Sequence, residues 1–173
     1  MTIDELYAKH SGMVYNLALH YVQNSEDAQE ITQDVFVAVY QSLEGYQKTS
    51  SISTWMYRIT INKSLDFLKA RQRKKRFAFL TSLFFPDSNE LRYNPPEHNH
   101  PGIVLEHKEA LEALFKKIND LPDNQRTALI LHKIEQKPQA EVAEIMNLST
   151  KAVESLIQRA KTNLSKMMDT SEG

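Results

Sequence analysis

Apolar residues recur at every third or fourth position along most of the chain, a spacing that predicts helices rather than strands. Three helices are expected in the first part, and the third should begin near Ile52–Thr54 and run into residues 69–76. Ser25, which precedes Glu26 and Asp27, is expected to cap the second helix. The apolar residues of the three helices would enclose one core: Met13, Val14, Leu17, Ala18 and Tyr21; Ala28, Ile31, Val35, Phe36, Val39, Tyr40 and Leu43; and Trp55, Ile59, Leu65 and Leu68.

The helical pattern stops over residues 77–102, a stretch that holds Pro86, Pro95, Pro96 and Pro101. A linker of about 25 residues is unusual inside one compact domain. We therefore predict two domains, at 1–76 and 103–173, joined by an extended linker. The linker begins with apolar side chains that need a surface to dock on, either on one of the domains or on a partner: Phe77, Phe79, Leu80, Leu83, Phe84 and Phe85.

The second domain is also predicted to be helical. Pro122 is expected in the first turn of one helix, and a short helix should follow Pro138. Asn147 suits a left-handed turn residue, and Ser149 suits the cap of the last helix. The fold class is therefore all-α, with these apolar positions in the second core: Leu111, Leu114, Phe115 and Ile118; Leu129, Ile130, Leu131 and Ile134; Val142, Ile145 and Met146; and Val153, Leu156, Ile157, Ala160 and Leu164.

Composition excludes several classes of chemistry. The 173 residues include no cysteine, so thiolate metal sites and thiol catalysis are excluded, and the four glycines cannot form a phosphate-binding loop. No apolar run approaches the roughly 20 residues that span a bilayer, and the first residues do not resemble a signal peptide. We expect a cytoplasmic protein without a membrane partner.

The formal net charge of −1 conceals an uneven distribution. Residues 58–76 hold eight basic side chains and one acidic one, whereas residues 1–57 carry a net −5, residues 77–106 a net −3 and residues 107–173 no net charge. A basic block of this density suits a polyanion such as nucleic acid. The alternative is a solvated helix end, where cations are also stabilised.

Two further patterns point to nucleic acid. Residues 139–166 have the layout of a helix–turn–helix, with a short helix, a three-residue turn and a longer capped helix; a plain helical hairpin is the alternative. Residues 46–62 mix aromatic and polar side chains, which suits the stacking and hydrogen bonding of unpaired bases. The alternative here is that Trp55 and Tyr57 belong to the core, and partial burial is the favoured interpretation for Trp55.

Two clusters of titratable residues are candidate sites for chemistry. Glu26, Asp27, Glu30 and Asp34 line one face of the second helix, which favours a solvated face or a basic protein partner over a metal or acid–base site. His98, His100 and His107 lack the ordered spacing of metal ligands. We predict no catalytic residues, no metal, no cofactor and no enzyme activity.

The chain resembles the extracytoplasmic-function (ECF) sigma factors of bacterial RNA polymerase, which belong to the sigma-70 family. Residues 24–43 (NSEDAQEITQDVFVAVYQSL) are similar to the region-two signature of this family, and residues 54–66 (TWMYRITINKSLD) to the part that follows it. Residues 121–126 (LPDNQR), together with 142–146 and 153–160, resemble region four. The resemblance implies a region 2 helical bundle at 1–76 and a region 4 helix–turn–helix at 103–173.

The resemblance also implies roles for individual residues. Glu30, Gln33 and Asp34 would bind the β′ clamp of core RNA polymerase, and the β flap of the polymerase is a further implied contact. Promoter DNA would be bound as melted single strand at the −10 element and as duplex at the −35 element, and an anti-sigma factor is an implied partner. The −10 residues would be Gln47, Lys48, Ser50, Ser51, Trp55, Arg58, Asn62, Lys63, Arg71, Arg73 and Lys74. The −35 residues would be Ser149, Thr150, Lys151, Glu154, Ser155, Gln158, Arg159 and Lys161.

Glu154 and Leu156 depart from the family, which often has basic residues early in this helix. Glu154 is expected either to accept a hydrogen bond from a cytosine amino group or to weaken phosphate attraction, and Leu156 to pack inward or against a partner. Two alternatives therefore remain beside the sigma factor. One is a stand-alone helix–turn–helix regulator, and the other is a sigma-like module recruited by another DNA-targeting complex.

Overall fold

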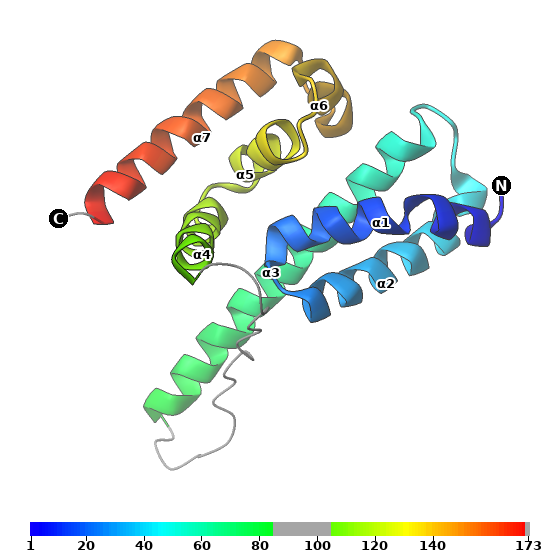
Figure 1. Ribbon diagram of the computed structural model, residues 1–173. Helices are drawn as coiled ribbons and strands as arrows, with labels where there is room; N and C mark the ends of the chain where they lie inside the picture. Colours follow the sequence, from blue (N-terminus) through cyan, green and yellow to red (C-terminus); the bar gives the residue numbers. More distant parts are fainter. Residues whose placement is uncertain (85–104, 172–173) are drawn as a thin grey trace.

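The computed structural model describes residues 1–84 and 105–171, for residues 105, 106 and 171 the backbone alone, and all the regular elements of these residues are helical. The first module contains α1 (Ile3–Val22), α2 (Ser25–Ser42), the 3₁₀ turn η1 (Leu43–Gly45) and α3 (Ile52–Phe84). The three long helices pack pairwise (Figure 1) and enclose a core in which Leu6, Val14, Val35 and Met56 are fully buried.

Hydrogen bonds at the helix ends explain where α1 and α2 begin. The Thr2 hydroxyl accepts from the Glu5 N–H, and the Glu5 carboxylate accepts from the Thr2 N–H, which makes a capping box. The cap of α2 is Asn24, whose Oδ1 accepts from the Asp27 N–H at 3.0 Å. The prediction that Ser25 caps this helix is therefore wrong by one residue.

Helix α3 extends to Phe84, so the first eight residues of the predicted linker, 77–84, are helical. Phe77, Phe79 and Leu80 do not oppose helix formation, and the first proline after them is Pro86. These side chains are exposed, so burial does not hold the end of the helix in place. The other residues of the predicted linker, 85–102, lie outside the described part of the chain.

The second module contains α4 (Leu105–Asn119), α5 (Asp123–Leu129), the π-helical turn η2 (Ile130–Ile134), α6 (Gln139–Met146) and α7 (Thr150–Ser171). Pro122 was predicted to lie in the first turn of this helix, but it is the residue just before α5. Arg126 joins α4 to α5, because its buried guanidinium donates to the carbonyls of Asn119 and Leu121. Burial lowers the pKa of Arg126, and nearby Asp123 opposes that shift.

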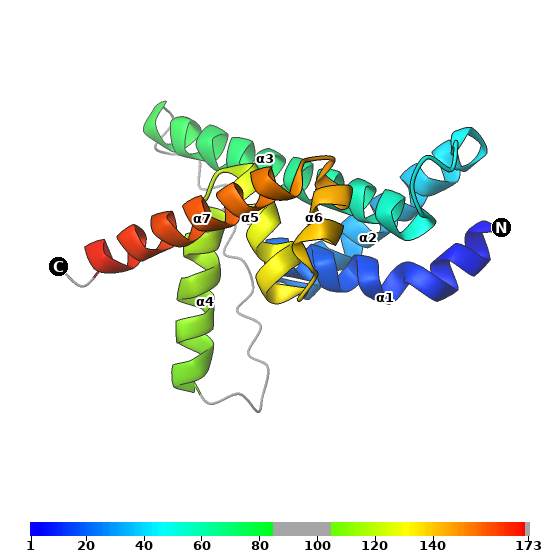
Figure 2. The same ribbon diagram turned by 90° about the horizontal axis from the view of Figure 1, so that it is seen from above.

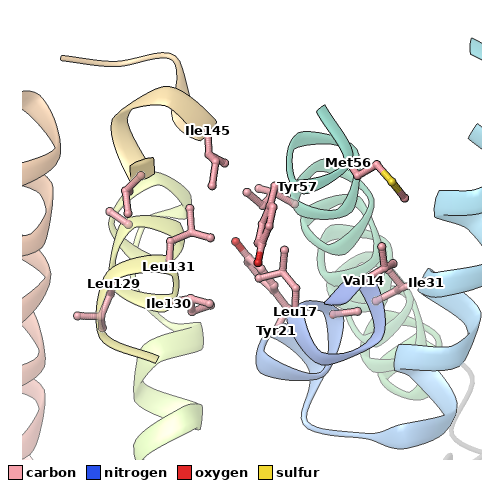
Figure 3. Packing of buried hydrophobic residues seen from close by; sticks show 14 of the residues in the cluster. Val14, Leu17, Tyr21, Ile31, Met56, Tyr57, Leu129, Ile130, Leu131 and Ile145 are labelled. Atoms are coloured by element: carbon pink, nitrogen blue, oxygen red, sulfur yellow. The ribbon is translucent and has the colours of Figure 1, made fainter. Parts of the chain in front are cut away.

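The two modules pack against each other through one continuous apolar core. In Figures 1 and 2, α5 and α6 lie beside α1 and α3, and the end of α7 points away from the first module. Figure 3 shows Ile130, Leu131 and Ile145 facing Tyr21 and Tyr57. The sequence pattern, which separated two cores, gave no indication of this contact.

Candidate nucleic-acid interface

The side chains of Glu30, Gln33 and Asp34 are exposed on the face of α2 that points away from α1 and α3. The same face carries Val37, which is 55% exposed, and Tyr40, which is 69% exposed. We call these five residues the α2 face. Tyr40 was predicted to lie in the core, and that prediction is wrong. Its spacing of seven residues from Gln33 could have placed it on the outer face.

The loop between α2 and α3 surrounds a hollow of about 390 Å³, which we call the loop hollow. This volume is near the lower end of the range of small-molecule pockets, about 300–1,000 Å³. The ring centroids of Tyr46 and Trp55 are 4.8 Å apart, and the Tyr46 hydroxyl donates to the Ser50 carbonyl. Both contacts fix the shape of the loop. The lining includes Ser42, Tyr46, Gln47, Ser50, Trp55 and Arg58.

The loop residues predicted to contact the −10 element differ in how accessible they are. Gln47 and Lys48 are exposed, and Lys48 has a positive φ of 55°, which turns the chain at that point. Ser51 is exposed as well, but its hydroxyl is used within the protein, since Oγ accepts from the Thr54 N–H and starts α3. Trp55 is partly buried, as predicted, and Tyr57 belongs to the core.

The basic residues of α3 are in different environments. Arg73 and Lys74 are exposed and have room for phosphates, as do their neighbours Lys75 and Arg76. Arg71 lies 3.3 Å from the Asp27 carboxylate and fastens α3 to the start of α2. Arg58 donates to two carbonyls of α6 in the second module.

Asn62 and Lys63 lie between these basic groups. Asn62 is exposed and borders a second hollow of about 330 Å³, which we call the inter-module hollow. Its lining combines α3 with the second module and includes Arg58, Asn62, Asn124, Thr127 and Asn147. Lys63 is half-buried.

Helices α6 and α7 form the predicted helix–turn–helix. Asn147 has φ 55° and ψ 47°, the left-handed conformation that ends α6, and the Ser149 hydroxyl accepts from the Ala152 N–H at 3.1 Å. Both predictions for this turn are confirmed. Val142, Ile145, Val153, Ile157 and Ala160 are buried and hold the two helices together.

The outer face of α7 keeps all the residues predicted to contact the −35 element accessible. Ser149 before the helix, and Thr150, Lys151, Glu154, Ser155, Gln158, Arg159 and Lys161 along it, are exposed. Leu156 is half-buried and packs against the core, which answers the question of its direction left open by the sequence. On the exposed face of α7, Glu154 therefore remains as the residue that departs from the basic residues common in the family.

The described residues offer little else for chemistry. They contain no cluster of three or more His, Asp or Glu side chains that could hold a metal ion, and His98 and His100 lie outside them. Helices long and apolar enough to cross a membrane are also not found among the described residues. What the structure presents is an acidic helix face, a loop hollow with an aromatic pair, a basic helix and an exposed second helix of a helix–turn–helix.

This combination defines a two-module helical protein equipped for nucleic acid. Residues 6–74 match the model of Sigma-70 region 2, and residues 111–164 match that of Sigma-70 region 4. The chain is 27% identical over 168 residues to the RNA polymerase sigma-H factor of Pseudomonas aeruginosa, covering 95% of this chain and 85% of that protein. It is 28% identical over 164 residues to the ECF RNA polymerase sigma factor SigM of Bacillus subtilis, covering 95% and 93%.

Solved structures show the same fold. CnrH in complex with the cytosolic domain of CnrY matches with a TM-score of 0.63 and 22% identity, over 97% of this chain and 88% of that chain. The sigma factor RpoE in complex with the anti-sigma factor NepR, from Bartonella quintana, matches with a TM-score of 0.58 and 17% identity, over 96% of each chain. The chain belongs to the sigma-70 family, in its ECF group. It is a transcription initiation factor and not an enzyme, and it directs promoter-specific transcription by RNA polymerase.

Proposed function

We propose that the α2 face binds the β′ clamp of core RNA polymerase. Its carboxylates and amide suit a basic partner, and the exposed Val37 and Tyr40 add apolar area at the centre of the contact. Tyr40→Ala should therefore weaken binding to core polymerase by about tenfold or more, as expected for an aromatic anchor. Gln41→Ala, on the next exposed position of α2, is the matched control and should bind normally.

The loop hollow receives an unpaired base of the −10 element. Support comes from the Tyr46–Trp55 pair and from the polar side chains Gln47 and Ser50 around it, because aromatic rings stack on bases and polar groups read their edges. Lys48, Ser51, Asn62 and Lys63 lie along the path toward the basic part of α3, where Arg73 and Lys74 hold phosphates. Arg58 and Arg71 join this surface only when their present partners release them.

The exposed face of α7 reads the −35 duplex. Gln158 and Arg159 are the base-reading residues, with Ser149, Thr150, Ser155 and Glu154 beside them, while Lys151 and Lys161 contact phosphates. Arg159→Ala should relax selectivity at the −35 element by about 1–3 kcal/mol. Lys161→Ala is the contrasting variant. It should weaken binding to all promoters alike and reduce the slope of log K against log salt by about 1.

The observation that carries the proposal is that one chain presents a polymerase face, a base hollow and a duplex-reading helix on separate elements. The test is run-off transcription with purified protein and bacterial core enzyme on a library of genomic fragments. A small set of fragments should be transcribed from defined starts. Transcription that is no more selective than that of core enzyme alone would contradict the proposal.

The same preparation separates the alternatives. A stand-alone regulator would bind promoter duplex tightly without core enzyme in a mobility-shift assay, and a recruited module would transcribe only when another DNA-binding complex is added. For the ECF factor we expect neither.

An anti-sigma factor is proposed as a further partner, supported by the RpoE–NepR complex among the similar structures. The proposed location is the cytoplasm, where core polymerase and the chromosome are found. Co-purification of the tagged chain from cells, with and without core polymerase depleted, tests both points.

A further inference from the structure

We propose that the end of α3 is a peripheral membrane site, which binds the surface of a bilayer that contains anionic lipids. The site consists of residues 73–84, which we call the α3 tip. It is a property of the free protein and does not depend on the proposed function. The expectation of no membrane partner rested on the lack of a spanning apolar run, which a peripheral contact does not need.

The α3 tip lies outside the packed part of the molecule. In Figures 1 and 2 it projects past the helices that surround the rest of α3. Its large apolar side chains are between 50% and 75% exposed: Phe77, Phe79, Leu80, Leu83 and Phe84. Phenylalanine and leucine are among the residues most often buried in proteins. Five of them together at the surface therefore mark a contact with an apolar partner.

These apolar side chains lie on one face of the helix. At about 100° per residue, all five fall within an arc of about 160°, and Ala78, Thr81 and Ser82 lie opposite. The Thr81 hydroxyl donates to the Phe77 carbonyl at 2.8 Å. The Ser82 hydroxyl donates to the Phe79 carbonyl, also at 2.8 Å. Because both hydroxyls already have a partner within the helix, moving this end out of water costs less.

Exposed cations precede the apolar side chains: Arg73, Lys74, Lys75 and Arg76. Helical spacing puts Arg73 on the apolar face, one turn before Phe77, and Arg76 one turn before Leu80. Residues 67–84 include no acidic side chain that would oppose an anionic surface. Guanidinium groups bind phosphates through paired hydrogen bonds. The order of groups along the helix therefore matches a layer of lipid phosphates followed by acyl chains.

The length of the apolar part suits the depth of such a contact. Residues 77–84 span about 12 Å at about 1.5 Å per residue. Interfacial helices bury their apolar face about 5–10 Å into the boundary between headgroups and acyl chains. A helix that enters at a slant, with Phe84 deepest, keeps Arg73 and Arg76 among the headgroups.

Two other partners fit the α3 tip less well. In a second copy of the chain, the arginines of one helix would face either arginines or phenylalanines of the other, because a symmetric pair is parallel or antiparallel. Nucleic acid suits the cations, but residues 77–84 hold no charged or amide side chain that could bind phosphates or read base edges. An anionic lipid surface suits both parts of the tip.

The test measures flotation of the purified full chain with lipid vesicles. The vesicles contain either phosphatidylcholine alone or equal parts of phosphatidylcholine and phosphatidylglycerol. We expect binding to the anionic vesicles to be stronger by about tenfold or more and to weaken as salt is raised. No binding, equal binding to both compositions, or competition by inorganic phosphate at constant ionic strength would overturn the proposal.

Apolar variants assign the binding to the α3 tip. Phe77→Ser with Phe84→Ser should weaken binding to the anionic vesicles by about tenfold or more, since two large apolar side chains leave the contact. Leu80→Ser and Leu111→Ser form a matched pair, because these leucines are 50% and 49% exposed on different helices. Leu80→Ser should weaken binding by about threefold or more, and Leu111→Ser should not change it. Equal effects of the two leucine variants would overturn the assignment to α3.

A charge variant tests the role of the arginines. Arg76→Gln should weaken binding to the anionic vesicles by about threefold or more and leave binding to the neutral vesicles unchanged. Arg159→Gln removes an exposed arginine of α7 and is the matched control. Equal losses in the two variants would show that net charge, and not the α3 tip, draws the protein to the vesicles.

The double phenylalanine variant also decides between lipid and the other two partners. Sedimentation of the wild type and the variant detects a second copy, and a mobility shift with a single-stranded oligonucleotide detects nucleic acid. A dimer or an oligonucleotide complex that is lost in Phe77→Ser with Phe84→Ser, while vesicle binding stays unchanged, would assign the apolar face to that partner and overturn the lipid site. Loss of vesicle binding alone is the result we expect.

Discussion

His10 is a buried side chain with a titratable group inside the first module. Its Nε2 is buried without a hydrogen-bond partner. Burial, and secondarily the neighbouring Lys9, hold the pKa of His10 below its ordinary value of 6.5. The folded protein therefore keeps this imidazole neutral at a pH where the unfolded chain takes up a proton.

The pH dependence of stability follows from this difference. Because the folded pKa is the lower one, the stabilising effect of neutral His10 is complete above about pH 6.5 and is lost as the pH falls toward the folded pKa. Urea unfolding at pH 7.5 and pH 5.5 should show lower stability at pH 5.5, and His10→Leu should reduce the difference. An NMR titration of His10 with a pKa at or above 6.5 would contradict this explanation.

Some residues have environments that depend only on their neighbours in the sequence, and others have partners on distant helices. Asn147 and Ser149 were placed correctly, because a left-handed residue followed by a hydroxyl cap is a local signal. Tyr40 was misplaced because an aromatic residue beside a buried stripe resembles a core residue, although it is 69% exposed. The partners of Arg58 and Arg71 were not predictable, because they come from other helices.

At the scale of the element, the turn between α6 and α7 depends on Asn147. A left-handed conformation costs an ordinary L-residue roughly 1–2 kcal/mol and costs glycine very little. Asn147→Val should therefore lower the free energy of unfolding by about 1–2 kcal/mol, whereas Asn147→Gly should change it by less than about 0.5 kcal/mol. Urea denaturation of both variants is the measurement. Equal stability of the two variants would show that the turn does not require this conformation.

The aromatic side chains at the end of α3 are exposed, so they should contribute little to stability. Phe77 is 73% exposed and Phe84 is 75% exposed, although both are aromatic, whereas Leu68 on the same helix is 9% exposed. Phe77→Ser should leave the free energy of unfolding within about 0.5 kcal/mol, and Leu68→Ala should lower it by about 2–5 kcal/mol. Thermal unfolding compares the two. A large loss in Phe77→Ser would mean that this side chain packs against another part of the protein in solution.

The helices themselves were largely predictable, since apolar spacing and capping residues are properties of short segments. The end of α3 was not, because the composition changes at residue 77 while helix formation continues to Phe84. A shift from buried to exposed apolar residues changes what a helix contacts without ending it. The pattern therefore marked the limit of the core and not the limit of the helix.

At the scale of the whole molecule, the sequence predicted two helical domains but not their joint core. Tyr21 and Ile130 each belong to an apolar stripe of their own helix, and a stripe does not identify the surface that covers it. The predicted DNA-binding residues of α7 and of α3 differ in how far the sequence predicts their exposure, for the same reason. The exposed residues of α7 could be read from local spacing, whereas the covered state of Arg58 depends on α6 and required the structure.

The Tyr21–Thr127 hydrogen bond makes the coupling between modules measurable. Trp55 is the single tryptophan and lies in the first module, so its fluorescence reports unfolding there. Thr127→Val changes only the second module but leaves the Tyr21 hydroxyl buried without its partner, and should lower the stability reported by Trp55 by about 1–3 kcal/mol.

Tyr21→Phe should have a similar effect, and the double variant should lose less than the sum of the two, because neither hydroxyl is then left unpaired. Thr162→Val, at an exposed position of α7 in the same module as Thr127, is the control and should not shift the Trp55 transition. If Thr127→Val also left that transition unchanged, the modules would unfold independently. A shift of that transition in Thr127→Val would instead mean that the contact between the two modules contributes to the stability of the first module.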